Sequence, residues 1–321
     1  AATDHCDASN FFPSTDKPLV GEKYVLRNVS NREVVVYIPK FSQTKKTLPE
    51  KGTDGSYMIG CDFDGSGTFK MKPQSEVTFY VRFEAHKEHE KPVNVDMEKE
   101  LSSRMSYIHN DIDGLLVLDT PDDVIDREFR FAKIRGSESI FRTKGGLMHG
   151  PGGESYYAAI WANDQAEYIN PFFPFLGYDK GNESALNSFR HFARFMNPEF
   201  KPIPSSIIAE GSDVWQGAGD RGDAAMIAYG AARYALARGN RQEAEDLWPL
   251  IEWCLEYCKR KRNSDGVVTS DSDELEGRFP AGKANLTTSS LYYDALISAS
   301  YLGKELKVSR SRIHSYQKEA K

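Results

Sequence analysis

Residues 223–239 read DAAMIAYGAARYALARG, a stretch made almost wholly of small and apolar residues. It predicts a helix from Asp223 to Arg238, with Gly239 well placed as its C-terminal cap. Alanines and a glycine allow neighbouring helices to approach this one closely. We therefore expect an inner helix that is packed on its sides by other helices.

The stretch that follows has the opposite character. Residues 242–262 alternate charged residues with Leu247, Trp248, Ile251, Leu255 and Cys258, which predicts an amphipathic helix with one buried face. Inner and outer helices that alternate along the chain describe stacked αα-hairpins.

Further helices are expected in the same part of the chain. The first begins at Thr120-Pro121, where Thr120 would be the N-cap and proline the first helical residue. The others are expected from about Tyr156, over 184–195, over 286–302 and from about Val308 onward. The sequence thus predicts a helical domain over residues 120–321.

The N-terminal region is predicted to be β-structure. Residues 24–26, 33–38 and 77–83 are rich in β-branched and aromatic residues, and turn formers separate them. Short strands at this spacing predict a small β-sandwich over residues 1–88, followed by a linker with one helix over 89–119. Within it, 62–67 predicts a glycine-rich hairpin rather than a calcium loop, because Pro73 replaces the required glutamate.

Composition excludes several classes of protein. The 321 residues carry a net charge of −6 that is spread along the chain, so nothing indicates nucleic acid as a partner. No apolar run approaches the roughly 20 residues of a membrane span. The start, AATD, is typical of a mature exported protein, so we expect a periplasmic or extracellular location. Whether Cys6 and Cys61 form a disulfide stays open, whereas Cys254 and Cys258 are expected to be buried thiols.

Three loops of the helical domain carry more polar and aromatic residues than turns require. The first, 145–168, is rich in glycine and brings Trp161, Asn163 and Asp164 together near a helix start. Asp164 could equally be a buried cap. The second, 210–226, contains Trp215, whose face suits a pyranose ring.

Asp220, Arg221 and Asp223 of that second loop can hydrogen-bond paired hydroxyl groups. The alternative is that Asp223 caps the helix while Arg221 pairs with Asp220.

The third loop lies in the stretch 271–296 and holds four acidic residues within six positions, followed by Arg278. These acids are Asp271, Asp273, Glu274 and Glu276. Solvated surface charge is one reading of them. Aromatics interleaved with carboxylates, arginines and amides across three loops favour a neutral, hydroxyl-rich ligand, so we expect a carbohydrate, with no metal and no cofactor.

With these motifs the chain resembles the six-hairpin glycosidases, the (α/α)6 toroid group that includes glucoamylases. Residues 161–164 (WAND) are similar to the group's Trp-x-Arg-Asp loop, with Asn163 where an arginine is common. Trp215 with 220–224 (DRGDA) resembles its sugar-contacting loop, and 273–276 (DELE) its acidic loop. The resemblance covers roughly residues 120–306. It implies a multi-domain α and β protein: a β-sandwich followed by an α/α toroid that is incomplete within these 321 residues.

The resemblance implies glycoside hydrolysis, in which one acid protonates the leaving oxygen and a second carboxylate acts as base or nucleophile. Crowded like charges raise one another's pKa, which makes Glu276 the first candidate for the acid and Glu274 the second. The second carboxylate is expected outside this chain. Sugar contacts are assigned to Trp161, Asn163, Asp164, Trp215, Asp220, Arg221, Asp223, Asp273 and Arg278.

Two other classes of protein remain possible from the sequence. One is a non-catalytic carbohydrate-binding protein that uses the same loops. The other is a polysaccharide lyase on an α/α scaffold, with His149, Tyr156, Asn163 and Arg221 as its functional residues.

Overall fold

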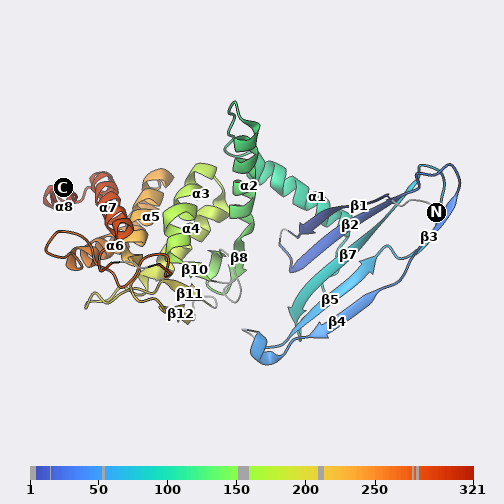
Figure 1. The fold of residues 1–321 in the computed structure, drawn as a ribbon, viewed down its shortest axis with the longest axis horizontal. Helices are drawn as coiled ribbons and strands as arrows, with labels where there is room; N and C mark the ends of the chain where they lie inside the picture. Colours follow the sequence, from blue (N-terminus) through green and yellow to red (C-terminus); the bar gives the residue numbers. More distant parts are fainter. Residues whose placement is uncertain are drawn as a thin grey trace. The chain divides into compact units, whose positions relative to one another are not determined.

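A computed structural model describes residues 5–14, 16–52, 55–150, 159–208, 213–276, 278–279 and 282–321, with the backbone alone over 5–10. The chain divides into two compact units, Ala1–Asp111 and Ile112–Lys321. The first unit is built on β-strands and the second mainly on helices (Figure 1).

The first unit contains a five-stranded antiparallel sheet in the order β1-β2-β7-β5-β4 and a two-stranded ribbon, β3-β6. The strands of the sheet are β1 (His5–Pro13), β2 (Leu19–Arg27), β7 (Glu76–Lys87), β5 (Tyr57–Asp64) and β4 (Ser42–Lys46), and those of the ribbon are β3 (Val34–Ile38) and β6 (Gly67–Met71). A short helix, η1 (Pro49–Lys51), lies between β4 and β5. The three stretches predicted as strands are confirmed within β2, β3 and β7.

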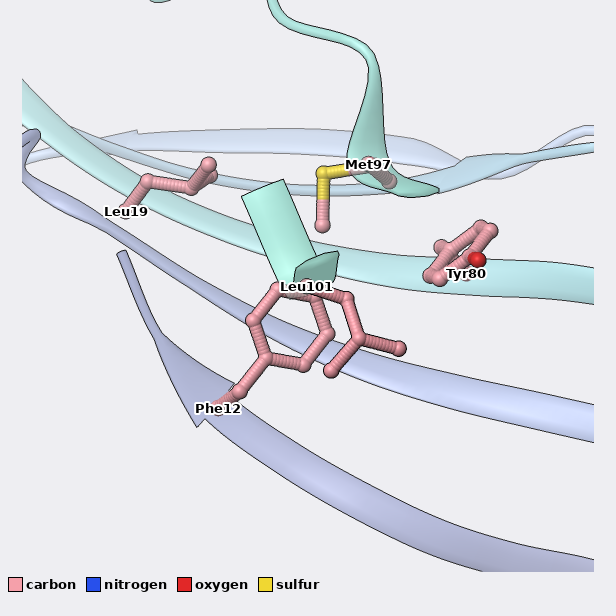
Figure 2. Close-up of a cluster of buried hydrophobic side chains, with 5 residues drawn as sticks. All are labelled: Phe12, Leu19, Tyr80, Met97 and Leu101. Atoms are coloured by element: carbon pink, nitrogen blue, oxygen red, sulfur yellow. The ribbon is translucent and has the colours of Figure 1, made fainter. Parts of the chain in front are cut away.

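One helix, α1 (Met97–Tyr107), packs on this sheet, and η2 (Ile108–Asp113) continues it to the end of the unit. Figure 2 shows the buried cluster that joins α1 to the strands: Phe12, Leu19, Tyr80, Met97 and Leu101. Gly21 makes room for the helix, because a Cβ there would lie 2.6 Å from Met97. The structure therefore places residues 97–111 in the N-terminal unit, inside the segment expected to be a linker.

Two expectations about this unit are decided by strand order. Cys61 carries a free thiol, and β2 and β7 lie between its strand and β1, which holds Cys6. Three strand spacings amount to about 14 Å, beyond the reach of a disulfide. The expected hairpin at 62–67 is wrong: Gly65, with φ 96°, turns the chain between β5 and β6, which pair with different strands.

The second unit begins with α2 (Asp123–Glu138) and the hairpin β8 (Ile140–Thr143) and β9 (Gly146–His149). A three-stranded sheet follows from β10 (Ile160–Trp161), β11 (Ser206–Ile208) and β12 (Asp213–Trp215). The helices after β10 are η3 (Asp164–Ile169), α3 (Asn170–Leu176), α4 (Asp179–Ala193), α5 (Asp223–Arg238), α6 (Arg241–Arg260), α7 (Leu286–Glu305) and α8 (Arg310–Glu319). Within the described ranges no helix is both long and apolar enough to cross a membrane.

Helix α5 is the centre of this unit, as its composition predicts. It contacts α3, α6, α7 and η3, and most of its residues are buried. A Cβ at Gly230 would lie 2.2 Å from the carbonyl oxygen of Ala166, so this glycine permits the closest approach between α5 and η3. Helix α6 buries one face only, which confirms the amphipathic pattern. Cys254 and Cys258 on that face are free and buried, as expected.

Two predicted helix starts require correction. Helix α2 begins after Asp122, whose carboxylate accepts from the backbone N–H of Val124, so Thr120 is not the N-cap. Thr120 instead donates its backbone N–H to Asp126. Of the helix expected from Tyr156, residues 156–158 lie outside the described residues; helical structure begins at Ala162 and continues into η3, because β10 occupies 160–161.

Candidate functional site

The site begins with two tryptophans on the small sheet. Trp161 on β10 pairs in register with Ser206 on β11, and Ser206 pairs with Trp215 on β12. Residues paired in register face the same side of a sheet, so both indoles stand on one face with a serine between them. Because the serine is small, the rings meet above it, with centroids 5.2 Å apart and planes inclined by 51°.

Arg221 joins the three loops that the sequence analysis singled out. Its side chain is fully buried, and its guanidinium carbon lies 5.7 Å from the Trp161 ring and 6.0 Å from the Trp215 ring. Its Nη2 donates to Asp223 at 3.0 Å and to Asn163 at 3.3 Å, and its Nη1 donates to Glu276 at 3.1 Å. Asn163, Asp223 and Glu276 belong to the first, second and third loops. One guanidinium therefore fixes the positions of all three.

The carboxylate of Asp223 makes its hydrogen bonds within the protein. Its carboxylate accepts from Ser205 Oγ at 2.8 Å and from the backbone N–H of Arg221 at 3.2 Å, in addition to the guanidinium. Burial raises the pKa of Asp223, and the neighbouring Arg221 opposes that shift. The arrangement makes Asp223 the counter-ion of Arg221.

Asp220 is likewise an anchor. It is almost fully buried and accepts from the Tyr257 hydroxyl at 2.5 Å and from the backbone N–H of Gly222 at 2.9 Å. Its backbone carbonyl accepts from the N–H of Asp271 at 2.8 Å, while the Asp271 carboxylate accepts from the N–H of Asp220 at 2.9 Å. These contacts tie the second loop to α6 and to the start of the third loop.

Asp164 and Glu276 are the predicted acids that lie around Arg221. Asp164, the first residue of η3, accepts from the Tyr168 hydroxyl at 3.0 Å. Burial raises its pKa, against the hydrogen bond from Tyr168 and the charge of Arg221. Glu276 has φ 60°, a left-handed conformation that is uncommon for a residue with a side chain.

The remaining predicted residues lie toward solvent. Asp273 Oδ1 accepts from the backbone N–H of Leu275 at 3.0 Å, and the N–H of Glu276 donates to its carbonyl at 3.0 Å, which makes a turn. The Arg278 side chain is largely exposed, and its guanidinium lies 3.6 Å from the second oxygen of Glu276. These two residues form the outer edge of the site.

The sequence analysis missed Glu167 on η3. Its carboxyl is largely buried, and Glu274 is among the charged groups that act on it. Burial, then the charge and hydrogen bond of Glu274, raise the pKa of Glu167 to about 8. A signal was present: Glu167 follows Asn163 by four positions, a spacing that places two residues on one face of a helix.

Of the residues considered for a lyase, Asn163 and Arg221 contact each other, whereas His149 belongs to the core. His149 is buried against Phe173 and contacts Gln165, whose amide donates to the His149 carbonyl at 2.6 Å. Burial lowers the pKa of His149 to about 4, as is typical of a core histidine. Tyr156 lies outside the described residues.

No family model and no curated protein matches the sequence. Solved structures resemble the chain in fold. A bacterial glucoamylase complexed with acarbose gives a TM-score of 0.49 at 10% identity, over 97% of this chain and 53% of that one. A GH78 family rhamnosidase of Bacillus sp. GL1 also gives 0.49 at 10% identity, over 97% and 32%.

A further similar structure is a family 105 glycoside hydrolase of C. acetobutylicum, with a TM-score of 0.44 at 14% identity, over 60% of this chain and 55% of that one. The chain thus spans about half, or less, of the length of these three structures.

Proposed function

We propose that the protein is a glycoside hydrolase acting on an oligo- or polysaccharide. The observation that carries the proposal is Arg221, buried beside two indole rings and hydrogen-bonded to a residue of each of three loops. Apolar ring faces beside a fixed set of amide and carboxylate oxygens suit the C–H faces and hydroxyl groups of a sugar. We further propose that the helical unit belongs to a toroid, that the N-terminal unit is a sandwich-type accessory domain, and that the protein is exported.

The proposed roles depend on whether the polar atoms of each residue already have hydrogen-bond partners within the protein. Trp161 and Trp215 would stack on sugar rings, and Asn163 and Asp164 would bind hydroxyl groups. Asp273 and Arg278 would contact the substrate at the outer edge, whereas Asp220 and Asp223 would act through Arg221.

The acid that protonates the leaving oxygen is proposed to be Glu274. Glu276 is the other candidate, but one of its oxygens already accepts from Arg221. Glu274 belongs to the same acidic loop and, in the part of the chain that the structure describes, makes no hydrogen bond to Arg221, whose two Nη atoms donate to Glu276, Asn163 and Asp223. Proton donation by a positioned carboxyl group contributes typically 10²–10⁴-fold to a rate.

Electrostatics favour a neutral sugar over a uronic acid. Asp164, Glu167, Asp223 and Glu276 all interact with Arg221, and two of them hydrogen-bond to it, while the exposed Arg278 at the outer edge lies against Glu276. Residues 151–158 and 209–212, which are not described structurally, contribute two glutamates and no lysine or arginine by sequence. An anionic sugar would therefore meet mostly like charge, and this argues against the lyase class, whose substrates are acidic.

The test compares Glu274→Gln and Glu276→Gln with a surface control, Glu256→Gln, which breaks an exposed pair with Arg260. Each variant is incubated with a panel of neutral oligosaccharides, with product release followed by anion-exchange chromatography and binding followed by tryptophan fluorescence. We expect Glu274→Gln to abolish turnover while retaining binding, and the control to behave as wild type.

The other outcomes discriminate between the classes. Binding by the wild-type protein without any product would overturn the hydrolase proposal in favour of a carbohydrate-binding protein. An ultraviolet-absorbing unsaturated product would instead identify a lyase. Loss of turnover in Glu276→Gln alone would assign the acid to Glu276.

A further inference from the structure

Tyr168 lies on η3, at the end of the first of the three loops. The residues of η3 that pack into the core, Gln165, Ala166 and Ile169, are buried. Tyr168 itself is 53% exposed, so its side chain is accessible to a ligand. The packed side of η3 fixes the position of this helix, while Tyr168 remains available on its open side.

The hydroxyl group of Tyr168 joins it to the candidate site. It donates to Oδ1 of Asp164 at 3.0 Å, four positions earlier on η3, a spacing that places both residues on one side of the helix. Asp164 follows Asn163, whose Oδ1 accepts from Nη2 of Arg221 at 3.3 Å. The Tyr168 hydroxyl is therefore connected, through two adjacent residues, to the guanidinium that links the three loops.

The contact between Tyr168 and Asp164 decides which hydrogen bonds these two residues can offer to a ligand. A tyrosine hydroxyl has one hydrogen atom, and a carboxylate has none. Because that one hydrogen is directed at Asp164, the phenolic oxygen and the carboxylate can only accept hydrogen bonds from a ligand. The pKa of Asp164 agrees with an ionised partner, because the hydrogen bond from Tyr168 and the charge of Arg221 both oppose the effect of burial.

Asn163 offers the opposite kind of contact. An arginine side chain only donates, so the amide oxygen of Asn163 must face Arg221 and its NH₂ group is the part that can bind a ligand as a donor. A sugar hydroxyl both donates and accepts. Neighbouring hydroxyl groups of a sugar could therefore be bound by Asn163 as acceptors and by Tyr168 and Asp164 as donors.

We propose that Tyr168 is a specificity-determining residue of the sugar site, which forms with Asp164 an acceptor-only pair that binds one sugar hydroxyl through its hydrogen atom. This inference rests on the proposed function. A sugar whose hydroxyl at that position is replaced by a group that cannot donate would leave both oxygens of the pair without a partner. Such unpaired polar groups are what makes a hydrogen-bonding site reject an analogue.

The first test needs no substrate. Protein labelled with ¹³C at the aspartate γ-carbons is titrated by NMR as wild type, Tyr168→Phe and Asp164→Asn, the last of which assigns the Asp164 signal. The control is Tyr301→Phe, because Tyr301 is 57% exposed and lies near the C-terminal end of α7. We expect Asp164 to be ionised at pH 7, and its pKa to rise in Tyr168→Phe but not in the control, because the hydrogen bond from Tyr168 lowers it.

Two results of this titration would show that the acceptor-only pair does not exist. One is an Asp164 that is still protonated at pH 7, and the other is a pKa of Asp164 that is the same in wild type and Tyr168→Phe. Either result overturns the inference without touching the proposed function.

The second test measures selectivity by calorimetry. The ligands are the best-bound member of a panel of neutral gluco-, manno- and galacto-oligosaccharides and its analogues in which one hydroxyl is replaced by fluorine, which cannot donate. We expect the wild type to bind one of these analogues at least about tenfold more weakly than the parent sugar. In Tyr168→Phe one acceptor is lost, so the parent should bind about three- to tenfold more weakly and the discrimination against that analogue should fall at least about threefold. Tyr301→Phe should keep the wild-type discrimination.

A merely structural role for Tyr168 would lower the Tm of Tyr168→Phe and leave the discrimination between parent and analogue as in the wild type. That result would overturn the inference. If Asp164 responds to Tyr168→Phe in the NMR titration but the wild type binds no sugar of the panel, the proposed function fails while the hydrogen-bonded pair stands.

Discussion

Replacing Arg221 by methionine should destabilise the helical unit far more than an ordinary arginine substitution. Methionine fills much of the same volume but leaves Asp223, 1% exposed, without its counter-ion. Breaking a buried ion pair from one side costs about 3–5 kcal/mol, because the remaining charge stays buried. For a unit of this size each kcal/mol lowers Tm by roughly 2–4 °C, so we expect a loss of about 10 °C or more.

The loss should depend on pH in a definite direction. Burial already raises the pKa of Asp223, and removing Arg221 removes the charge that opposes this shift. An acid whose folded-state pKa is raised loses stability as pH rises above its unfolded-state value, which is about 3.9. The difference between variant and wild type should therefore be smallest near that pH and increase toward neutrality.

The assay is thermal unfolding followed by circular dichroism at several pH values, with two comparison variants. Arg233→Met, on helix α5, removes an exposed pair with Asp294 and should cost no more than about 1 kcal/mol. Arg221→Met/Asp223→Asn removes both charges of the buried pair and should recover at least half of the lost stability. The reasoning is refuted if Arg221→Met is no worse than Arg233→Met, or if the double variant recovers nothing.

Three further predictions concern single contacts. Trp215→Ala removes one of the two stacking faces and should weaken binding of a neutral oligosaccharide about tenfold by calorimetry, whereas Trp248→Phe, which packs against Tyr316 of α8, should not. Gly230→Ala places a methyl group 2.2 Å from the backbone of η3 and should lower the free energy of unfolding in urea by about 1–3 kcal/mol. A smaller loss would mean that α5 and η3 separate easily. Tyr257→Phe removes the hydroxyl that donates to buried Asp220 and should cost about 1.5–3 kcal/mol, with a near-neutral result showing that this anchor is dispensable.

The helical core could be read from local sequence. Helix α5 begins and ends where its composition and C-terminal glycine predict, and α6 buries the predicted face. The small-residue pattern of α5 and the amphipathic pattern of α6 each repeat within a few residues, so each helix can be predicted from its own sequence. Helix α2 shows the limit of such signals, because Thr120 and Asp122 both suit an N-cap and the carboxylate of Asp122 takes that position.

The N-terminal unit could be assigned as β-structure, but its strand order could not be derived. Hydrophobic runs identify β2, β3 and β7, whereas the placement of β7 between β2 and β5 depends on pairing between distant segments. For the same reason the relation of Cys6 to Cys61 could not be read from spacing, although strand order settles it.

The sequence by itself determined which loops carry aromatic and acidic residues, because those residues are adjacent along the chain. Only the tertiary structure decided which of these residues contact one another and which are buried as structural partners. It shows Arg221 with a hydrogen-bond partner in each of three loops, and Asp220 and Asp223 satisfied within the protein. Hydrogen bonding and desolvation depend on what surrounds a group in space. Here Arg221 and its partners Glu276 and Asn163 lie more than fifty positions apart along the chain.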